Sequence, residues 1–119
     1  MSKFMVNLTA INVFDKQRST PPIEVMVDTG AENSWLPRKA LEDAGIVPQR
    51  KRRYMTADKR VIERDVGYAI LTAEGYDALD EVVFAEENDL SLLGVRTIEG
   101  FNVMVDNVAQ RFVATIPTV

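Results

Sequence analysis

The chain has 119 residues, of which 46% are hydrophobic and 27% charged, with a formal net charge of -4. This size and composition predict a single soluble globular domain covering residues 1–119, and the acidic balance argues against nucleic acid as a partner. The absence of both histidine and cysteine excludes serine triads, cysteine–histidine dyads and the common zinc sites. Hydrolytic chemistry would therefore rest on carboxylates, lysine, tyrosine, hydroxyls or oxygen-ligated metals.

No apolar run approaches the length of a membrane span, and the first residues lack the layout of a signal peptide. We therefore expect a cytoplasmic protein with no membrane partner.

The first part of the chain alternates between apolar and polar residues. This pattern predicts a half-buried strand over residues 4–14. Residues 15–22 are mostly polar and end in two prolines, which indicates a turn. A second apolar run, residues 23–27, then predicts a strand that ends at Asp28.

The residues after this strand are Asp28, Thr29, Gly30 and Ala31. A carboxylate at the end of an apolar strand needs hydrogen-bond partners or a functional reason. Thr29 can supply a hydroxyl, and Gly30 permits backbone angles and close approaches that other residues do not. The alternative interpretation is a strand that runs into an ordinary turn of the Asp-Gly type.

The middle of the chain predicts a short helix and a long hairpin. Residues 38–44 have helical spacing, with proline before them and glycine after them. The basic run at residues 49–53 is interpreted as the solvated edge of a strand. Residues 54–72 predict a hairpin in which Ile62, Val66, Tyr68 and Ile70 share one face, and its bend is formed by Ala57, Asp58, Lys59 and Arg60.

The last third predicts further strands around a second glycine motif. Residues 77–85 predict a strand, and the loose acidic group that follows it is interpreted as a solvated loop. An apolar-apolar-glycine segment then leads into a short helix over residues 95–100. Two strands follow, at 101–105 and 111–116. The apolar-apolar-glycine segment consists of Leu92, Leu93 and Gly94. Taken together, the elements predict an all-β fold with one or two short helices.

The apolar strand followed by Asp28-Thr29-Gly30-Ala31 resembles the active-site signature of aspartic proteases. Leu92-Leu93-Gly94 resembles the apolar-apolar-glycine segment found late in the retropepsin-like (retroviral-type) branch, in which one small domain carries one such signature. The resemblance covers roughly residues 4–116. It implies a retropepsin-like acid-protease half-barrel in which residues 57–60 form the tip of a flap, although this tip lacks the glycine pair of the retroviral pattern.

The resemblance also implies an enzymatic activity. It makes Asp28 the catalytic residue of an aspartic endopeptidase that uses no cofactor and no metal, and one chain supplies only one such carboxyl. A homodimer would bring two Asp28 carboxyls together to activate a water molecule, with the Thr29 hydroxyl bonding across the dimer axis and Gly30 keeping the loop close to the substrate. The substrate would be an extended peptide or protein, and the terminal strands of the two subunits would interleave.

Three other interpretations stay open at this point. The domain could be a catalytically silent retropepsin-like module that dimerises or binds peptides. It could be an unrelated β-rich binding domain in which Asp28-Thr29-Gly30 is only a turn. A metal hydrolase that uses Asp28 with Glu32 is less favoured, because the chain has no histidine and no recognisable ligand pattern.

Overall fold

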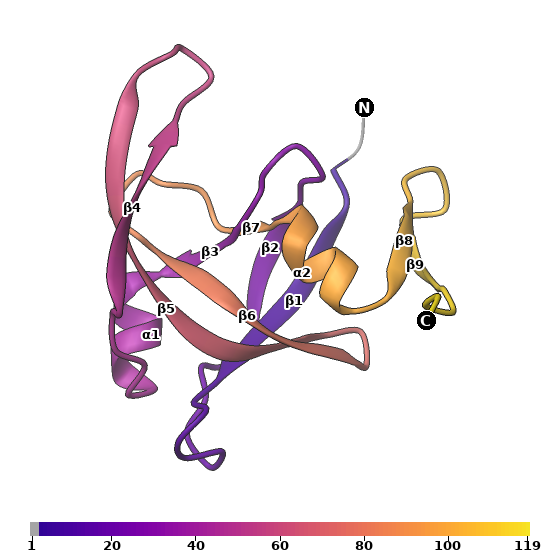
Figure 1. Cartoon of the computed structure of the whole chain (residues 1–119), viewed down its shortest axis with the longest axis horizontal. Helices are drawn as coiled ribbons and strands as arrows, with labels where there is room; N and C mark the ends of the chain where they lie inside the picture. The colour runs from indigo at the N-terminus through magenta and orange to yellow at the C-terminus, as the bar shows by residue number, and fades with distance from the viewer. Residues whose placement is uncertain (1–2) are drawn as a thin grey trace.

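The computed structural model describes residues 3–119, which form nine strands and two short helices (Figure 1). Strands dominate, as the sequence predicts. The elements are β1 (Met5–Ile11), β2 (Ile23–Val27), β3 (Ser34–Pro37), α1 (Arg38–Asp43), β4 (Arg50–Met55), β5 (Val61–Ala73), β6 (Tyr76–Ala85), β7 (Leu92–Leu93), α2 (Val95–Gly100), β8 (Val103–Asp106) and β9 (Arg111–Ala114).

Seven of the strands form one sheet in the order β1-β2-β7-β3-β6-β5-β4. An additional pairing of β1 with β5 joins two distant strands of this order and closes six strands into a ring, from which β4 extends as an edge strand. The basic run therefore does form the edge of the sheet, as its composition predicts. Most of the pairings are antiparallel, but β2 pairs with β7, and β3 with β6, in parallel.

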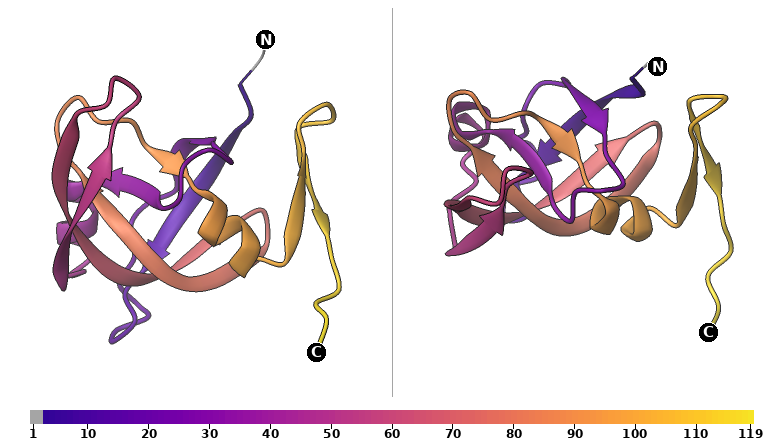
Figure 2. Two further views of the ribbon diagram at one scale, coloured as in Figure 1. Left: turned by 45° about the horizontal axis from the view of Figure 1, so that its top comes forward. Right: turned by 90° about the horizontal axis from the view of Figure 1, so that it is seen from above.

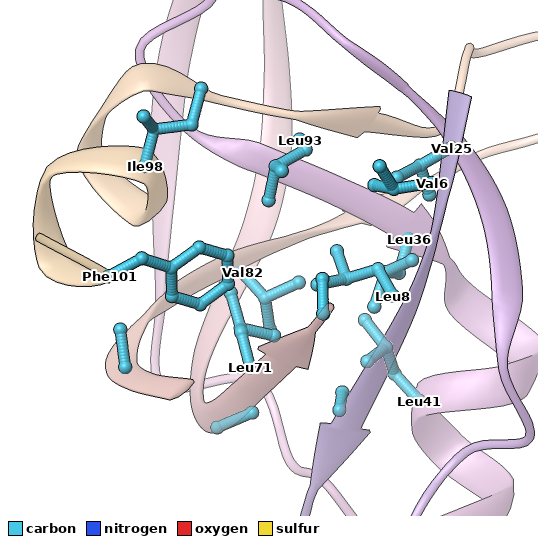
Figure 3. Packing of buried hydrophobic residues seen from close by; sticks show 14 of the residues in the cluster. Val6, Leu8, Val25, Leu36, Leu41, Leu71, Val82, Leu93, Ile98 and Phe101 are labelled. Atoms are coloured by element: carbon cyan, nitrogen blue, oxygen red, sulfur yellow. The ribbon is translucent and has the colours of Figure 1, made fainter. Parts of the chain in front are cut away.

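The interior of the ring is the hydrophobic core, to which alternate residues of the strands contribute (Figure 3). On β1, the alternation read from the sequence is confirmed, because every second residue from Phe4 to Ala10 is buried. The fully buried side chains Leu8, Leu36, Leu71 and Leu93 come from four different strands. Burial of these side chains ties the ring together, since each contributes roughly 1.5–3 kcal/mol of transfer free energy.

The long strand β5 has two different roles along its length. Its first half pairs with β4 to make a hairpin that projects from one end of the molecule (Figure 1). Its second half pairs with β6 and β1 and belongs to the ring. The predicted shared face is only partly buried, because Val66 is buried but Tyr68 is 49% exposed. In the ring half of β5, the buried face is instead the one that carries Ala69 and Leu71.

The strands β8 and β9 form a separate two-stranded sheet. This C-terminal hairpin stands beside the ring, with helix α2 leading into it (Figure 2). It is held against the ring by an aromatic cluster in which Phe112 contacts Phe4, Tyr76 and Phe101 at ring-centroid distances of 5.4, 6.2 and 6.2 Å. The predicted final strand is thus shorter than residues 111–116 and pairs with its own chain.

Candidate active site

Asp28 lies directly after β2 and is half-buried, at the start of a loop in which Thr29 and Gly30 are exposed. The carboxyl oxygen Oδ1 of Asp28 accepts a hydrogen bond of 2.9 Å from the N–H of Gly30. Within residues 3–119, this is the only hydrogen bond of the Asp28 side chain, and the hydroxyl of Thr29 has none. The loop therefore presents a carboxylate and a free hydroxyl at the surface.

The main chain around Asp28 is fixed by the second glycine motif. The Asp28 N–H donates to the carbonyl oxygen of Leu93 at 2.9 Å, which extends the pairing of β2 with β7. The N–H of Val95 donates to the carbonyl oxygen of Ala31 at 2.8 Å. A Cβ atom at Gly94 would lie 2.3 Å from the backbone oxygen of Asn33, so the two segments touch where only glycine fits.

Hydrogen bonds of two buried hydroxyls stabilise the contact between these two segments. The hydroxyl of Ser34 accepts a hydrogen bond of 3.0 Å from the N–H of Gly94 and lies 2.6 Å from the hydroxyl of Thr97. Thr97 in turn donates to Asp80 at 2.9 Å. Because Ser34 and Thr97 are fully buried, these satisfied hydrogen bonds hold the exposed loop on a rigid base.

An open cleft of about 760 Å³ lies between this loop and the β4–β5 hairpin. The Asp28 loop contributes Asp28, Gly30 and Ala31, and the hairpin contributes residues 53–57 and Ile62. Apolar side chains form much of the remaining wall, including Trp35, Leu90 and Leu92. The walls of the cleft are of mixed polarity.

A comparison with protein families now adds independent evidence. A family model described as aspartyl protease matches residues 12–97, which include the Asp28 loop, the hairpin and Leu92-Leu93-Gly94. The chain belongs to this aspartyl protease family. The family is of the retropepsin-like clan, as the two sequence motifs indicate. A search of curated proteins finds no match.

In this aspartyl protease, the predicted flap tip is a polar turn. Residues 57–60 join β4 to β5, and Lys59 adopts a positive φ of 66° where a glycine would be unstrained. Thr56 hydrogen-bonds to Asp58, whose carboxylate pairs with Arg60 at 2.8 Å. The hydrogen bonds from Thr56 and Arg60 lower the pKa of the Asp58 carboxyl. The tip is therefore organised by its own side chains, and only Ala57 of the four predicted tip residues lines the cleft.

The β4 strand at the base of the predicted flap contacts the segment that follows Asp28 through Asn33, a residue for which the sequence predicts no role. The buried amide of Asn33 accepts hydrogen bonds from Tyr54 at 2.9 Å and from Arg52 at 3.3 Å. The ring of Tyr54 packs on that of Trp35, with centroids 5.2 Å apart. Trp35 is therefore a wall of the cleft as well as a packing residue, whereas its neighbour Leu36 is fully buried.

Glu81 joins the flap base to helix α2 through three guanidinium groups. Its carboxylate, 6% exposed, pairs with Arg50, with Arg52 at 3.1 Å and with Arg96 at 2.9 Å. Burial raises the pKa of Glu81, but the hydrogen bond from Arg50 and the three positive charges outweigh it, so that the pKa lies below its ordinary value. Of the basic run, Arg50 and Arg52 thus pair with Glu81, and Lys51 pairs with Asp65 at 3.0 Å.

The acidic group near residue 87 also has structural partners. Glu86 pairs with Arg38 at 2.7 Å, and Asp89 pairs with Arg64 at 2.7 Å. In the part of the chain that the structure describes, no cluster of three or more acidic residues is arranged to hold a metal ion. None of the helices in residues 3–119 is long and apolar enough to cross a membrane.

Proposed function

We propose that this chain is an aspartic endopeptidase whose active site forms at a homodimer interface, where two Asp28 carboxyls activate a water molecule. Membership of the aspartyl protease family supports a protease at the general level. The observation that carries the proposal is the half-buried Asp28 at the edge of an open cleft, whose carboxyl has no side-chain hydrogen bond in residues 3–119 other than the one from Gly30.

The chemistry explains why one chain would not suffice. Attack of water on a peptide carbonyl requires a base to take the proton from water and an acid to protonate the carbonyl oxygen. Two carboxyls in contact share one proton, because both cannot be ionised at close range; aspartic proteases are the standard example of this behaviour. The ionised Asp28 would act as the base and the protonated Asp28 of the other subunit as the acid. Collapse of the tetrahedral intermediate would then break the C–N bond as the amine is protonated.

Several features of the loop are suited to such a pairing. Thr29 is exposed, and its hydroxyl has no partner in residues 3–119, so it is free to bond across a twofold axis. The C-terminal hairpin has two free strand edges, which a second copy could pair. In Figure 1, the tip of the β4–β5 hairpin and the loop after β2 lie toward the top of the molecule, and the β8–β9 hairpin stands at its right end. We propose that the second subunit sits against the face that carries the Asp28 loop.

The substrate would be an extended peptide in the cleft. The outer edge of β4 is unpaired within residues 3–119, and Met55 at its end lines the cleft. A peptide added along this edge would satisfy the free main-chain groups, and the apolar wall formed by Trp35 and Leu92 would receive its side chains.

The decisive experiment uses a peptide library and the Asp28→Asn variant. The parent chain should cleave peptides, and a statine-type transition-state mimic should inhibit this cleavage. Asp28→Asn should show no measurable cleavage. Cleavage that is sensitive to a chelator and insensitive to the mimic would contradict the proposal.

A second candidate is a catalytically silent member of the family that dimerises or binds peptides. The observation in its favour is the polar flap tip, in which Asp58 bonds to Thr56 and Arg60, while neither Asp58 nor Arg60 lines the cleft. Peptide binding by the parent chain without any cleavage would favour this candidate.

A further inference from the structure

Asn33 is a buried polar residue next to the proposed active site, and it is contacted mainly by the flap. It follows Asp28 in the same loop and has no exposed surface. Its carbonyl oxygen Oδ1 accepts the 2.9 Å hydrogen bond from the Tyr54 hydroxyl and the 3.3 Å bond from Nη1 of Arg52. Arginine can only donate, so Oδ1 rather than Nδ2 must face the flap strand.

Nδ2 of Asn33 is buried and has no hydrogen-bond partner in residues 3–119. A buried donor without a partner is unfavourable, and rotation of the amide would not help, because it would place Nδ2 against Arg52. The side chain of Asn33 is therefore held in place as an acceptor for two residues of β4.

The two donors lie on the inner side of the flap strand. Arg52 and Tyr54 are half-buried, whereas their neighbours Lys51, Arg53 and Met55 are exposed, as the two-residue period of a strand requires. Arg52 is also paired with Glu81 and stacks over the ring of Tyr54 at 5.6 Å. Of the two donors to Asn33, the Tyr54 hydroxyl is therefore the uncharged one, and it links the flap strand to the proposed catalytic loop through a neutral hydrogen bond.

We propose that the hydrogen bond from Tyr54 to Asn33 positions the flap strand over the catalytic loop before substrate binds, and that Tyr54 and Asn33 are positioning residues for peptide binding. This inference rests on the proposed protease function only for its kinetic consequence. Its structural consequence, a flap base held against Trp35 in the free protein, can be measured without any cleavage.

The kinetic consequence follows from the order of events. If the flap base is already in place, the peptide does not have to order it on binding. The apparent affinity for peptide is then not lowered by a population of molecules in which the flap base is displaced. Once peptide is bound, its own contacts hold the flap. Loss of the hydrogen bond should therefore raise KM and leave kcat nearly unchanged.

The experiment compares Tyr54→Phe with a matched control, Tyr68→Phe. Both changes remove one phenol hydroxyl, but the hydroxyl of Tyr68 makes no hydrogen bond within residues 3–119, and Tyr68 is half exposed on β5 and does not line the cleft. Tyr54→Phe keeps the aromatic ring that packs on Trp35, so that any change reports the hydroxyl alone.

Trp35 is the only tryptophan of the chain, so its fluorescence reports the flap base directly. We expect acrylamide to quench Trp35 more strongly in Tyr54→Phe than in the parent or in Tyr68→Phe. With a cleaved peptide, Tyr54→Phe should raise KM about threefold to tenfold, the effect of one neutral hydrogen bond, with kcat changed by less than about twofold. Tyr68→Phe should change neither.

Unchanged quenching in Tyr54→Phe would overturn the inference whether or not the protein is a protease. A fall in kcat at constant KM would overturn it as well. In an Asn33→Ala background, Tyr54→Phe should have no further effect on either readout, and an equal additional effect would show that the two residues act separately. If Asn33→Ala does not fold, the comparison of Tyr54→Phe with Tyr68→Phe decides alone.

Discussion

The main-chain N–H of Asp28 donates to the carbonyl oxygen of Leu93 at 2.9 Å. This hydrogen bond joins the two motifs that are recognisable in the sequence, the Asp-Thr-Gly loop and the apolar-apolar-glycine segment. It also continues the parallel pairing of β2 with β7, so that the loop leaves the sheet at a fixed point. The second motif therefore has a physical role, which is to hold the backbone of the first.

The first prediction concerns the carboxyl of Asp28. Asp28→Asn keeps the size of the side chain and an oxygen that can accept from Gly30, but it removes the titratable group. We expect peptide cleavage to fall by at least about 10²–10⁴-fold, the usual contribution of acid–base catalysis, with unchanged thermal stability. Peptide cleavage and thermal unfolding of the same preparation are the measurements. Activity equal to that of the parent would disprove the assigned role.

A second prediction concerns the close contact at Gly94. Gly94→Ala places a methyl group 2.3 Å from the backbone oxygen of Asn33, and backbone cannot move aside as a flexible side chain can. We expect a loss of at least about 2 kcal/mol in the free energy of unfolding, together with reduced activity, because the catalytic loop must shift. Denaturant unfolding measures the first effect.

The control is Gly75→Ala, at the turn between β5 and β6. Gly75 has a positive φ of 82° but no atom within 4 Å of an added Cβ. The free energy of unfolding of Gly75→Ala should therefore fall by only about 1 kcal/mol, from backbone strain, and the variant should keep its activity. Equal losses at both positions would show that the contact with Asn33 has no special weight.

Much of the fold follows from local patterns in the sequence. The alternation from Phe4 to Ala10 predicts β1 and its buried face, and proline and glycine mark the ends of α1. The glycine motif correctly predicts that α2 begins after Gly94. These features depend on neighbouring residues, which the sequence displays directly.

The features that depend on distant partners could not be predicted in this way. The pairing of β1 with β5 closes the ring, and nothing near either strand indicates it. Nothing in the sequence marks Asn33, because its partners, Arg52 and Tyr54, come from another strand. The basic run gave no sign that Arg50 and Arg52 would both pair with Glu81, since a single glutamate in a later strand is not a pattern.

A third prediction concerns pH and the Glu81 carboxylate. Its pKa is lowered in the folded protein, so it contributes stability above the ordinary glutamate pKa of about 4.3, and this contribution disappears as pH falls through the folded value. Glu81→Gln should therefore destabilise the protein by about 1–3 kcal/mol at pH 7, a range reduced by the solvent exposure of Arg50 and Arg96. As the pH falls through the lowered pKa of Glu81, the parent and the variant should converge.

Thermal unfolding between pH 7 and pH 3 measures this convergence. The carboxyls of Asp65 and Asp89 also have lowered pKa values, through hydrogen bonds from Arg38 and Arg64, so both proteins should lose some stability in acid. The test is the difference between the two curves. A difference that stays constant with pH would mean that the charge of Glu81 is not what stabilises the flap base.

The last prediction links activity to assembly. If each chain supplies one Asp28 to a shared site, specific activity should fall on dilution through the dimer dissociation constant, with a second-order dependence on concentration at the low end. Excess Asp28→Asn chains should inhibit the parent, because mixed dimers carry one titratable carboxyl. Light scattering and peptide cleavage over the same concentration series provide the comparison.

The C-terminal segment allows a sharper form of this test. Removing residues 112–119 would delete Phe112, which packs on Phe4 and Phe101 within its own chain, so loss of activity there would not distinguish folding from assembly. Residues 116–119 instead lie exposed beyond β9, and Thr115 still bonds to Asn102 without them. At high protein concentration, a chain that ends at Thr115 should have the thermal stability of the parent. If the tail contributes to the dimer, the specific activity of this shortened chain should begin to fall at a higher protein concentration than that of the parent when both are diluted. Identical dilution curves would exclude the tail as a dimer contact, and constant specific activity far below the dissociation constant would show that one chain is enough for catalysis.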